Sequence, residues 1–452
     1  MGRLRPVLIA TLMAVCVPAL LFAQGSNAAP AINQADTAWM LTSTALVLLM
    51  TPALAFFYGG LVGSKNVLNT MMMSFIALAF IGVLWAVLGY SLAFGTGSDW
   101  IGDTSFLFLQ GVGLDAKGTI PHLLFMCYQA TFAIITAALI SGAIIGRMRF
   151  SAYVTFITLW ALFVYSPIAH WVWGGGWLSK MGALDFAGGT VVHVNAGAAA
   201  FVAAWVLGPR RGYPRVPTLP HNVPFTLLGA GLLWFGWFGF NSGSALAANG
   251  IAALAFTTTL LAPAGTLAAW TLLDAARTKR PTAVGAATAI VVGLVAVTPA
   301  AGYLGPMSAL ILGAIAAIPS YYGLQIRART TLDDSLDVVA AHGVGGTVGA
   351  LLTGVFAQKA LNGVADGMLF GNPAQLGIQA IAVLAAIVYS GTLSFVLLKL
   401  VGLVVPLRAD ARDESTGLDE TQHGEEAYGL LGGVTTMAGD GGSEREMAHV
   451  HP

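Results

Sequence analysis

Two stretches of this 452-residue chain decide its fold, DFAGGTVVHVNAG at 185–197 and DSLDVVAAHGVGG at 334–346. In each stretch an aspartate precedes a histidine by eight residues, and the histidines are His193 and His342. Each histidine lies about one helical turn inside a long apolar segment. The same spacing at matching places in the two halves indicates an internal repeat.

The composition is that of a membrane protein. Hydrophobic residues make up 57% of the chain and charged residues only 9%, whereas soluble domains carry roughly a quarter charged residues. A chain with so few charges is solvated by lipid. The formal net charge is zero, which favours neither nucleic acid nor an acidic partner. Cys16 and Cys127 lie far apart and suggest no disulfide framework and no metal site.

Apolar segments of about 20 residues each can cross a hydrocarbon core of roughly 30 Å. Their density in Gly and Ala suits helices that pack closely on one another. The sequence predicts an all-α polytopic membrane protein with eleven transmembrane helices at 37–58, 67–94, 121–145, 151–172, 190–207, 222–242, 251–273, 282–300, 305–324, 339–357 and 376–404.

A second pair of similar strings supports the repeat. FFYGG at 56–60 ends the first predicted span, and FGFNSG at 238–243 ends the sixth. Spans one to five and six to ten then form two halves, with the eleventh span peripheral. Because five is odd, the second half is inverted relative to the first. Such inverted 5+5 repeats place a transport pathway at their interface, near the middle of the membrane.

Lys and Arg placement predicts the orientation, because cytoplasmic loops are enriched in both. With the N-terminus outside, the cytoplasmic connections carry eleven of these residues and the external connections three. The eleven are Lys65, Arg147, Arg149, Arg210, Arg211, Arg215, Arg277, Lys279, Arg280, Arg327 and Arg329, and the three are Lys117, Lys180 and Lys359. We therefore expect a cytoplasmic C-terminus.

The two ends of the chain differ from the span region. Residues 1–23 combine a short basic region, an apolar run and a small residue, as a secretory signal peptide does. The alternative is a twelfth membrane helix. We expect the transmembrane domain at 24–406 and a cytoplasmic tail at 407–452, whose last part, 429–452, is rich in Gly, Ser and acidic residues.

Ionisable groups inside a membrane are functional hypotheses because burying them is costly. If the two halves face each other, His193 and His342 meet, and one neutral imidazole can donate a hydrogen bond to the other. Such a pair could relay a proton from a small amine-like substrate. Alternatives are two separate packing histidines, or ligation of a haem, which no other motif in the sequence supports.

Three aspartates flank these spans. Asp185 could attract a cation directly, or it could cap the helix N-terminus, which is the favoured interpretation. Asp334 is expected to cap the equivalent helix on the cytoplasmic side, and Asp337 is grouped with it as a second structural capping residue.

Several side chains could hold a cation near the outside. Aromatic faces attract cations and a serine hydroxyl can accept a hydrogen bond from one. Trp173, Phe132, Phe240 and Ser244 qualify, but their spacing does not distinguish them from other aromatics, and Trp173 could equally belong to an interfacial aromatic belt.

These strings resemble the ammonium transporter (Amt) family, of which the Rh glycoproteins are distant relatives. The segment 185–197 resembles the family signature, and the match continues in order through WFGFNSGS at 237–244, TPAAGY at 298–303, HGVGG at 342–346 and GLDETQHGEEAY at 417–428. The resemblance runs from about residue 36 to 428. Trp173 and Ser244 together favour the bacterial Amt branch.

The resemblance implies a role for each candidate. External recruitment of ammonium falls on Trp173, Phe132 and Ser244, with Asp185 behind them. A stacked phenyl gate falls on Phe132 and Phe240, and the twin pore histidines are His193 and His342. Tyr128 stands where many relatives have Phe. The family further implies the eleven-helix fold, a homotrimer and, in bacteria, closure of the cytoplasmic face by a PII-type protein.

The sequence thus favours a transporter for nitrogen uptake in the bacterial inner membrane, with neither enzymatic activity nor a cofactor. Ammonium would be recruited by aromatic faces and conducted as ammonia, with or without its proton, past the histidines. Two other classes remain: an ammonium sensor that signals through its tail, and a membrane redox enzyme.

Overall fold

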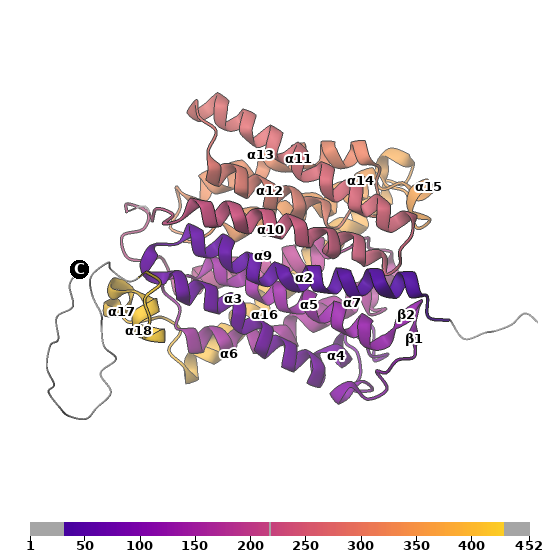
Figure 1. Ribbon diagram of the computed structural model, residues 1–452, viewed down its shortest axis with the longest axis horizontal. Coiled ribbons are helices and arrows are strands. Elements are labelled where there is room, and N and C mark those ends of the chain that lie inside the picture. The colour runs from indigo at the N-terminus through magenta and orange to yellow at the C-terminus, as the bar shows by residue number, and fades with distance from the viewer. Residues whose placement is uncertain (1–30, 217, 429–452) are drawn as a thin grey trace, which may run out of the picture.

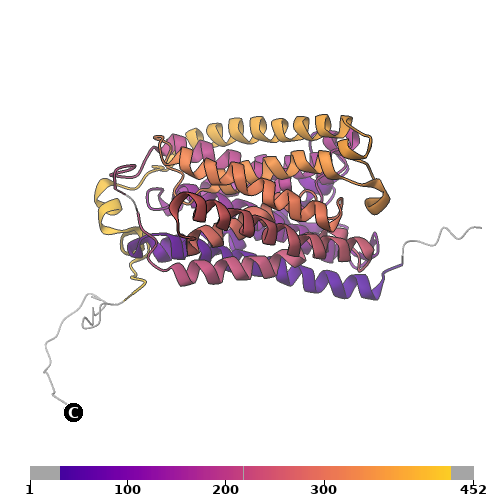
Figure 2. The same ribbon diagram turned by 90° about the horizontal axis from the view of Figure 1, so that it is seen from above.

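The computed structural model describes residues 31–216 and 218–428 of the chain, so the expected signal peptide at 1–23 lies outside the described residues. Most of these residues are helical, and the long helices run side by side along one common direction (Figures 1 and 2). The helices are α2 (Gln34–Leu61), α3 (Val67–Leu84), α4 (Tyr90–Phe94), α5 (His122–Ile140), α6 (Phe150–Trp160), α7 (Ser166–Trp173), α8 (Trp177–Met181), α9 (Asn195–Leu207), α10 (Val223–Ser242), α11 (Gly250–Thr278), α12 (Ala283–Val297), α13 (Pro306–Arg327), α14 (Gly345–Phe356), α15 (Lys359–Asn362), α16 (Ala374–Val404), α17 (Ala411–Thr416) and α18 (Leu418–His423).

The two ends of the bundle differ. The short helices α17 and α18 lie at one end, here called the tail face, and a small hairpin of β1 (Ala116–Lys117) and β2 (Ile120–Pro121) lies at the other (Figure 1). Helix α15 also lies at the hairpin end (Figure 1).

Within the described residues, ten helical segments are long and apolar enough to cross a membrane. They coincide with ten of the eleven predicted spans, and their ends differ from the predicted ones by five residues or fewer, except that the fourth segment continues to Met181, nine residues beyond the predicted end at 172. The fold class predicted from the sequence is therefore confirmed, apart from the exact number of full-length spans.

The predicted span 282–300 is shorter than expected. Helix α12 has 15 residues and rises about 22 Å at 1.5 Å per residue, less than the roughly 30 Å of a hydrocarbon core. The chain turns at Thr298 and Pro299, where the carbonyl oxygens accept hydrogen bonds from the backbone N–H groups of Ala187 and Phe186, at 3.2 and 3.1 Å. A loop of the first half therefore terminates a helix of the second half.

The spans that carry the two histidines begin with an unusual backbone. Residues Gly189–Val194 and Val339–Val344 are π-helical and lead directly into α9 and α14. Short π-helical segments within longer helices often mark functional sites. Their matching places in the two halves agree with the repeat seen in the sequence.

Helices α2 and α10 pack against each other along most of their length, and glycines of α10 make this possible. A Cβ atom added at Gly229 would lie 2.3 Å from the Phe57 backbone nitrogen, and one added at Gly236 would lie 2.8 Å from the Leu46 carbonyl oxygen. Small residues at such contacts let two backbones approach closely, which drives helix association in membranes.

The tail face is held together by buried charges. The Asp333 carboxylate accepts hydrogen bonds from Arg210 at 2.8 Å, and Arg147 lies 3.8 Å away with its side chain fully buried. Burial alone would raise the pKa of Asp333, but the hydrogen bonds and charges of Arg210 and Arg147 outweigh it and lower the pKa. These contacts join loops from the two halves.

Two glycines of α10 offer a direct test of the helix contact. Gly229→Ala should lower the stability of the protein by about 1–3 kcal/mol, because the new methyl group overlaps the backbone of α2. Gly231→Ala is the matched control: no atom lies within 4 Å of its Cβ position, and the change should be neutral or slightly stabilising. Thermal unfolding of the purified protein, followed by tryptophan fluorescence, would measure both, and equal Tm values would contradict the proposed contact.

Candidate functional site

The two histidines meet in the interior of the bundle. The Nδ1 atoms of His193 and His342 lie 3.1 Å apart, within hydrogen-bond distance, and the rings are nearly parallel at 24°. Both side chains are buried, 2% and 4% exposed. Since each neutral imidazole has one donor and one acceptor nitrogen, one ring must donate to the other at this contact. The Nε2 atom of His193 has no hydrogen-bond partner within the described residues.

Close backbone contacts between the two halves set this distance. A Cβ atom at Gly197 would lie 2.4 Å from the Gly343 Cα atom, and one at Gly346 would lie 2.9 Å from the His193 Cβ atom. The segments that carry the histidines therefore touch through glycines, and any larger residue would separate the rings. The direct Nδ1 contact also leaves no space for a haem between the two rings.

Asp185 fixes the start of the first of these segments. Its Oδ1 atom accepts hydrogen bonds from the Gly188 and Gly189 N–H groups, at 3.0 and 2.6 Å. Its Oδ2 atom accepts from Thr190 and Val191, at 2.9 and 3.0 Å. Both oxygens of this buried carboxylate are thus occupied by N–H groups that a helix start leaves unpaired, which is the geometry of a cap.

The two aspartates of the second half differ from each other. The Oδ2 atom of buried Asp334 accepts a hydrogen bond from the Val339 N–H group at 2.7 Å, at the start of the second π-helical segment. Asp337 was expected to cap as well, but its carboxylate instead pairs with the Arg327 side chain at 2.8 Å. Asp337 has a positive φ of 62°, a left-handed backbone conformation that non-glycine residues rarely adopt.

A layer of aromatic rings lies beside the histidine pair. Phe132 of α5 and Phe240 of α10 are stacked, with ring centroids 4.1 Å apart and an angle of 18° between the rings. Both are buried, and Phe240 lies 6.2 Å from the His193 ring. The stacked pair therefore separates the histidines from the side chains beyond it.

Trp173 and Ser244 lie beyond the stacked pair and are partly exposed. The Trp173 ring meets Phe132 edge-on at 5.9 Å, and its Nε1 atom donates to the Asp185 carbonyl oxygen at 2.9 Å. The same aspartate thus orients the tryptophan and caps the helix behind it. These contacts hold the Trp173 ring in the site.

Tyr128 also belongs to this group of side chains around Phe132 and Ser244, although the sequence alone did not identify it as a site residue. Its ring lies 4.9 Å from that of Phe132, and its hydroxyl oxygen lies 3.2 Å from Ser244 Oγ. The hydroxyl also donates to the backbone carbonyls at the end of α10, while Ser244 Oγ donates to the Phe240 carbonyl oxygen at 2.8 Å. The site therefore contains two neighbouring hydroxyl groups as well as aromatic faces.

A narrow apolar cavity adjoins the phenyl pair and the histidines. Trp237 forms part of its wall, stacked on His193 with centroids 5.4 Å apart, and donates to Thr298 Oγ1 at 2.9 Å. Apart from the two imidazoles, the lining is hydrophobic: Met50, Leu54, Phe57, Ile135, Leu139, Val192, Leu233, Trp237, Phe240 and Val291. Trp237 was not among the predicted site residues, although it lies in the quoted segment 237–244.

Comparison with known proteins identifies the family of this chain. The sequence model of the Ammonium Transporter Family matches residues 38–428. The chain belongs to the ammonium transporter family. The resemblance seen in the sequence is therefore confirmed, and the transporter matches over nearly all of its described length.

Individual relatives from bacteria and fungi support the same family assignment. The ammonium transporter of Bacillus subtilis (strain 168) is 47% identical over 402 residues, covering 88% of this chain and 99% of its own. That of Aquifex aeolicus is 47% identical over 414 residues, covering 90% and 96%. Among solved structures, Candida albicans Mep2 has a TM-score of 0.80 at 34% identity, covering 84% and 88%. A protein described as a sensor Amt protein also has a TM-score of 0.80, at 30% identity, covering 86% and 98%.

The capping role of Asp185 in this transporter can be tested by stability. Asp185→Ala should lower the free energy of unfolding by at least about 1–3 kcal/mol, because it leaves buried N–H groups unpaired. Asp185→Asn keeps one acceptor oxygen and should have a smaller effect. Thermal unfolding in detergent would measure both.

Asp99→Ala provides the comparison, since Asp99 forms an exposed ion pair with Lys180 worth roughly 0–1 kcal/mol. If Asp185→Ala were no more destabilising than Asp99→Ala, the carboxylate would not be an important cap.

Proposed function

We propose that this chain conducts ammonium across the membrane as ammonia, after removing its proton at or before the histidine pair. The observation that carries the proposal is the buried imidazole pair, with Nδ1 atoms 3.1 Å apart, behind a stacked phenyl pair and in an apolar cavity. An unpaired cation in such a cavity costs many kcal/mol, whereas neutral ammonia costs far less. The proton must therefore leave the cation.

Recruitment would take place on the partly exposed side of the phenyl pair. The Trp173 and Phe132 rings offer cation–π contacts worth about 2 kcal/mol when desolvated. Ser244 Oγ can accept a hydrogen bond from ammonium, and we add the neighbouring Tyr128 hydroxyl as a second acceptor. Asp185 supports the site indirectly by holding Trp173.

Passage requires the phenyl gate to open. Phe132 and Phe240 are in contact and buried, so their rings must rotate to admit a molecule. Beyond them, the histidine pair offers the polar nitrogen atoms of an otherwise hydrophobic cavity. Potassium has no hydrogen to donate to a hydroxyl and no proton to lose, so the same site would exclude it.

The remaining proposals concern the membrane, the oligomeric state and the partner of the protein. The Lys and Arg asymmetry supports an orientation with the tail face in the cytoplasm and the recruitment site outside. The similarity to bacterial ammonium transporters supports a location in the bacterial inner membrane. As the resemblance implies, we propose a homotrimer with one pathway in each subunit. A PII-type protein would bind the cytoplasmic face.

Replacing both histidines by leucine tests the proposed pathway. His193→Leu/His342→Leu should lower ammonium-driven charge movement in proteoliposomes at least tenfold if transport is electrogenic, because no group remains to accept a proton in the apolar cavity. If transport is neutral, a pH probe inside the vesicles should report the same loss. Potassium pulses measure selectivity.

His122→Gln is the control. His122 begins α5 at the hairpin end, where its Nε2 atom contacts the Tyr90 hydroxyl oxygen, and the variant should transport normally. Unchanged ammonium flux and unchanged potassium exclusion in the double leucine variant would rule out the proposed mechanism.

A sensor function is the second candidate, favoured by the similarity to the sensor Amt protein and by the docking of the tail on the membrane domain. The Asp419 carboxylate accepts from the Leu68 and Asn69 N–H groups, at 3.0 and 2.7 Å, near the start of α3. The Gln422 side chain accepts from the Phe150 N–H group at 2.7 Å, at the start of α6. The tail thus supplies N-terminal caps for two spans, through which it could report their positions.

Asp419→Ala should release the tail, because two helix-start N–H groups lose their acceptor. We expect faster proteolysis of the tail and altered transport, with the exposed neighbour Glu420→Ala unchanged. Deletion of everything after Arg412 should have a similar or larger effect. Normal transport and a normal nitrogen response in the truncated protein would leave the tail a passive extension, whereas ammonium binding without flux in the full chain would favour the sensor.

A further inference from the structure

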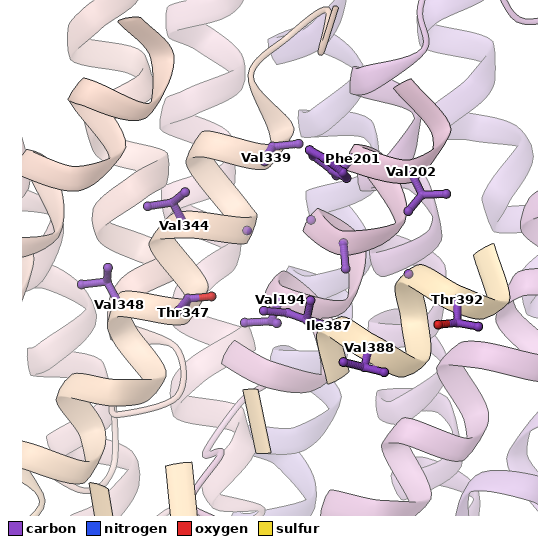
Figure 3. A pocket seen from close by; sticks show the side chains of 14 residues that line it. Val194, Phe201, Val202, Val339, Val344, Thr347, Val348, Ile387, Val388 and Thr392 are labelled. Carbon is purple, nitrogen blue, oxygen red and sulfur yellow. The ribbon is translucent and has the colours of Figure 1, made fainter. Parts of the chain in front are cut away.

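A large apolar groove lies on the outer side of the helices that carry the histidine pair. It has a volume of about 590 Å³, within the roughly 300–1,000 Å³ typical of small-molecule sites. Side chains of α9, of the segment Val339–Phe356 and of α16 surround it (Figure 3). Phe201, Ile387 and Val388 are 46%, 41% and 56% exposed, so the groove opens onto the surface.

The walls of this groove are formed by helices that cross the membrane. Its walls belong to three membrane-spanning segments, Gly189–Leu207, Val339–Phe356 and Ala374–Val404. Its lining is almost entirely aliphatic, with Thr347 and Thr392 as the side chains that carry a hydroxyl. Water gains little in such a space, whereas a hydrocarbon chain can fill it with dispersion contacts.

The groove leads towards an aromatic and cationic end. On α16, the stripe of Val388 and Thr392 continues at helical spacing to Phe395 and Lys399. The Phe395 ring stacks on Trp205 of α9, with centroids 5.8 Å apart, and the Lys399 Nζ atom lies 5.3 Å from the Phe395 ring centroid. Lys399 is exposed and forms no ion pair with any other described residue.

This combination has the chemistry of one kind of molecule. Trp205 is 63% exposed and lies with Lys399 near the tail-face ends of α9 and α16, where aromatic and basic side chains meet lipid headgroups. An aliphatic groove with an unpaired lysine about two helical turns beyond Thr392, its last lining residue on α16, is complementary to an amphiphile with an apolar chain and an anionic head. We propose that the groove binds one acyl chain of an anionic membrane phospholipid, whose phosphate contacts Lys399.

Such a lipid would lie directly behind the histidine pair. Val194 and Gly343 line the groove and are the immediate neighbours of His193 and His342 in the chain. The acyl chain would therefore press on the outer side of the two π-helical segments and on their contact at Gly197 and Gly343. Binding itself, however, does not depend on the proposed transport function.

The test is lipid binding to the purified full chain in detergent, measured by native mass spectrometry. The probes are palmitoyl-oleoyl phosphatidylglycerol and the zwitterionic phosphatidylcholine with the same chains. Gly391→Leu should weaken binding of both lipids at the tightest site at least tenfold. Its Cβ atom fits, 3.8 Å from Val202 Cγ2, and the side chain fills the groove. Lys399→Gln should weaken phosphatidylglycerol alone, by about fivefold.

Gly377→Leu is the matched control, because it adds the same side chain to α16 outside the groove, where no atom lies within 4 Å of the Cβ position. This variant should bind both lipids as tightly as the unchanged protein does. Thermal unfolding without added lipid shows whether each variant is folded. If Gly391→Leu does not fold, Val388→Trp serves as a second variant whose side chain fills the groove.

Three results would overturn the proposal. Unchanged lipid binding in both filling variants would exclude the groove as the site. An unchanged preference for phosphatidylglycerol in Lys399→Gln would exclude the headgroup contact. Efficient disulfide cross-linking of two copies through Val388→Cys in native membranes would show that a second subunit covers this face.

Discussion

The direct contact between two buried imidazole rings constrains the rest of the structure. A separation of 3.1 Å between Nδ1 atoms, inside a wall of aliphatic and aromatic side chains, leaves room for neither ring to move far. Each ring comes from a different half of the chain, so both halves must be held in register. The glycines at 197, 343 and 346 bring the backbones together, and Asp185 and Asp334 fix the starts of the segments that carry the rings.

Much of this could be predicted from the sequence because membranes impose strong rules on composition. Long apolar segments identify helices, and ten of the eleven predicted spans appear nearly as expected. The costs of burying a histidine and an aspartate draw attention to the repeated Asp–His spacing, and the structure brings both histidines together. The contacts among Trp173, Phe132, Phe240 and Ser244, in contrast, could be expected only through the family resemblance.

Other features depend on contacts that a linear pattern does not contain. Hydrophobicity alone cannot distinguish a π-helical segment from an α-helix, so the sequence does not predict the π-helical backbone at 189–194 and 339–344. The hydroxyl of Tyr128 becomes part of the site because α5 lies beside the end of α10. Asp337 resembles a capping residue in sequence, but its carboxylate pairs with Arg327 of the preceding helix instead. The apolar groove joins α9 to two spans that come much later in the chain, Val339–Phe356 and Ala374–Val404.

The short helix α12 has a consequence for the way the chain enters the membrane. A segment that rises only about 22 Å leaves one end within the hydrocarbon layer, where free carbonyl groups are costly. Two of these carbonyls are satisfied by N–H groups of the loop that follows Asp185, which is synthesised earlier. The end of this helix therefore acquires its full stability only when the first half is already in place. The two halves are related by symmetry, but they are not interchangeable steps of biogenesis.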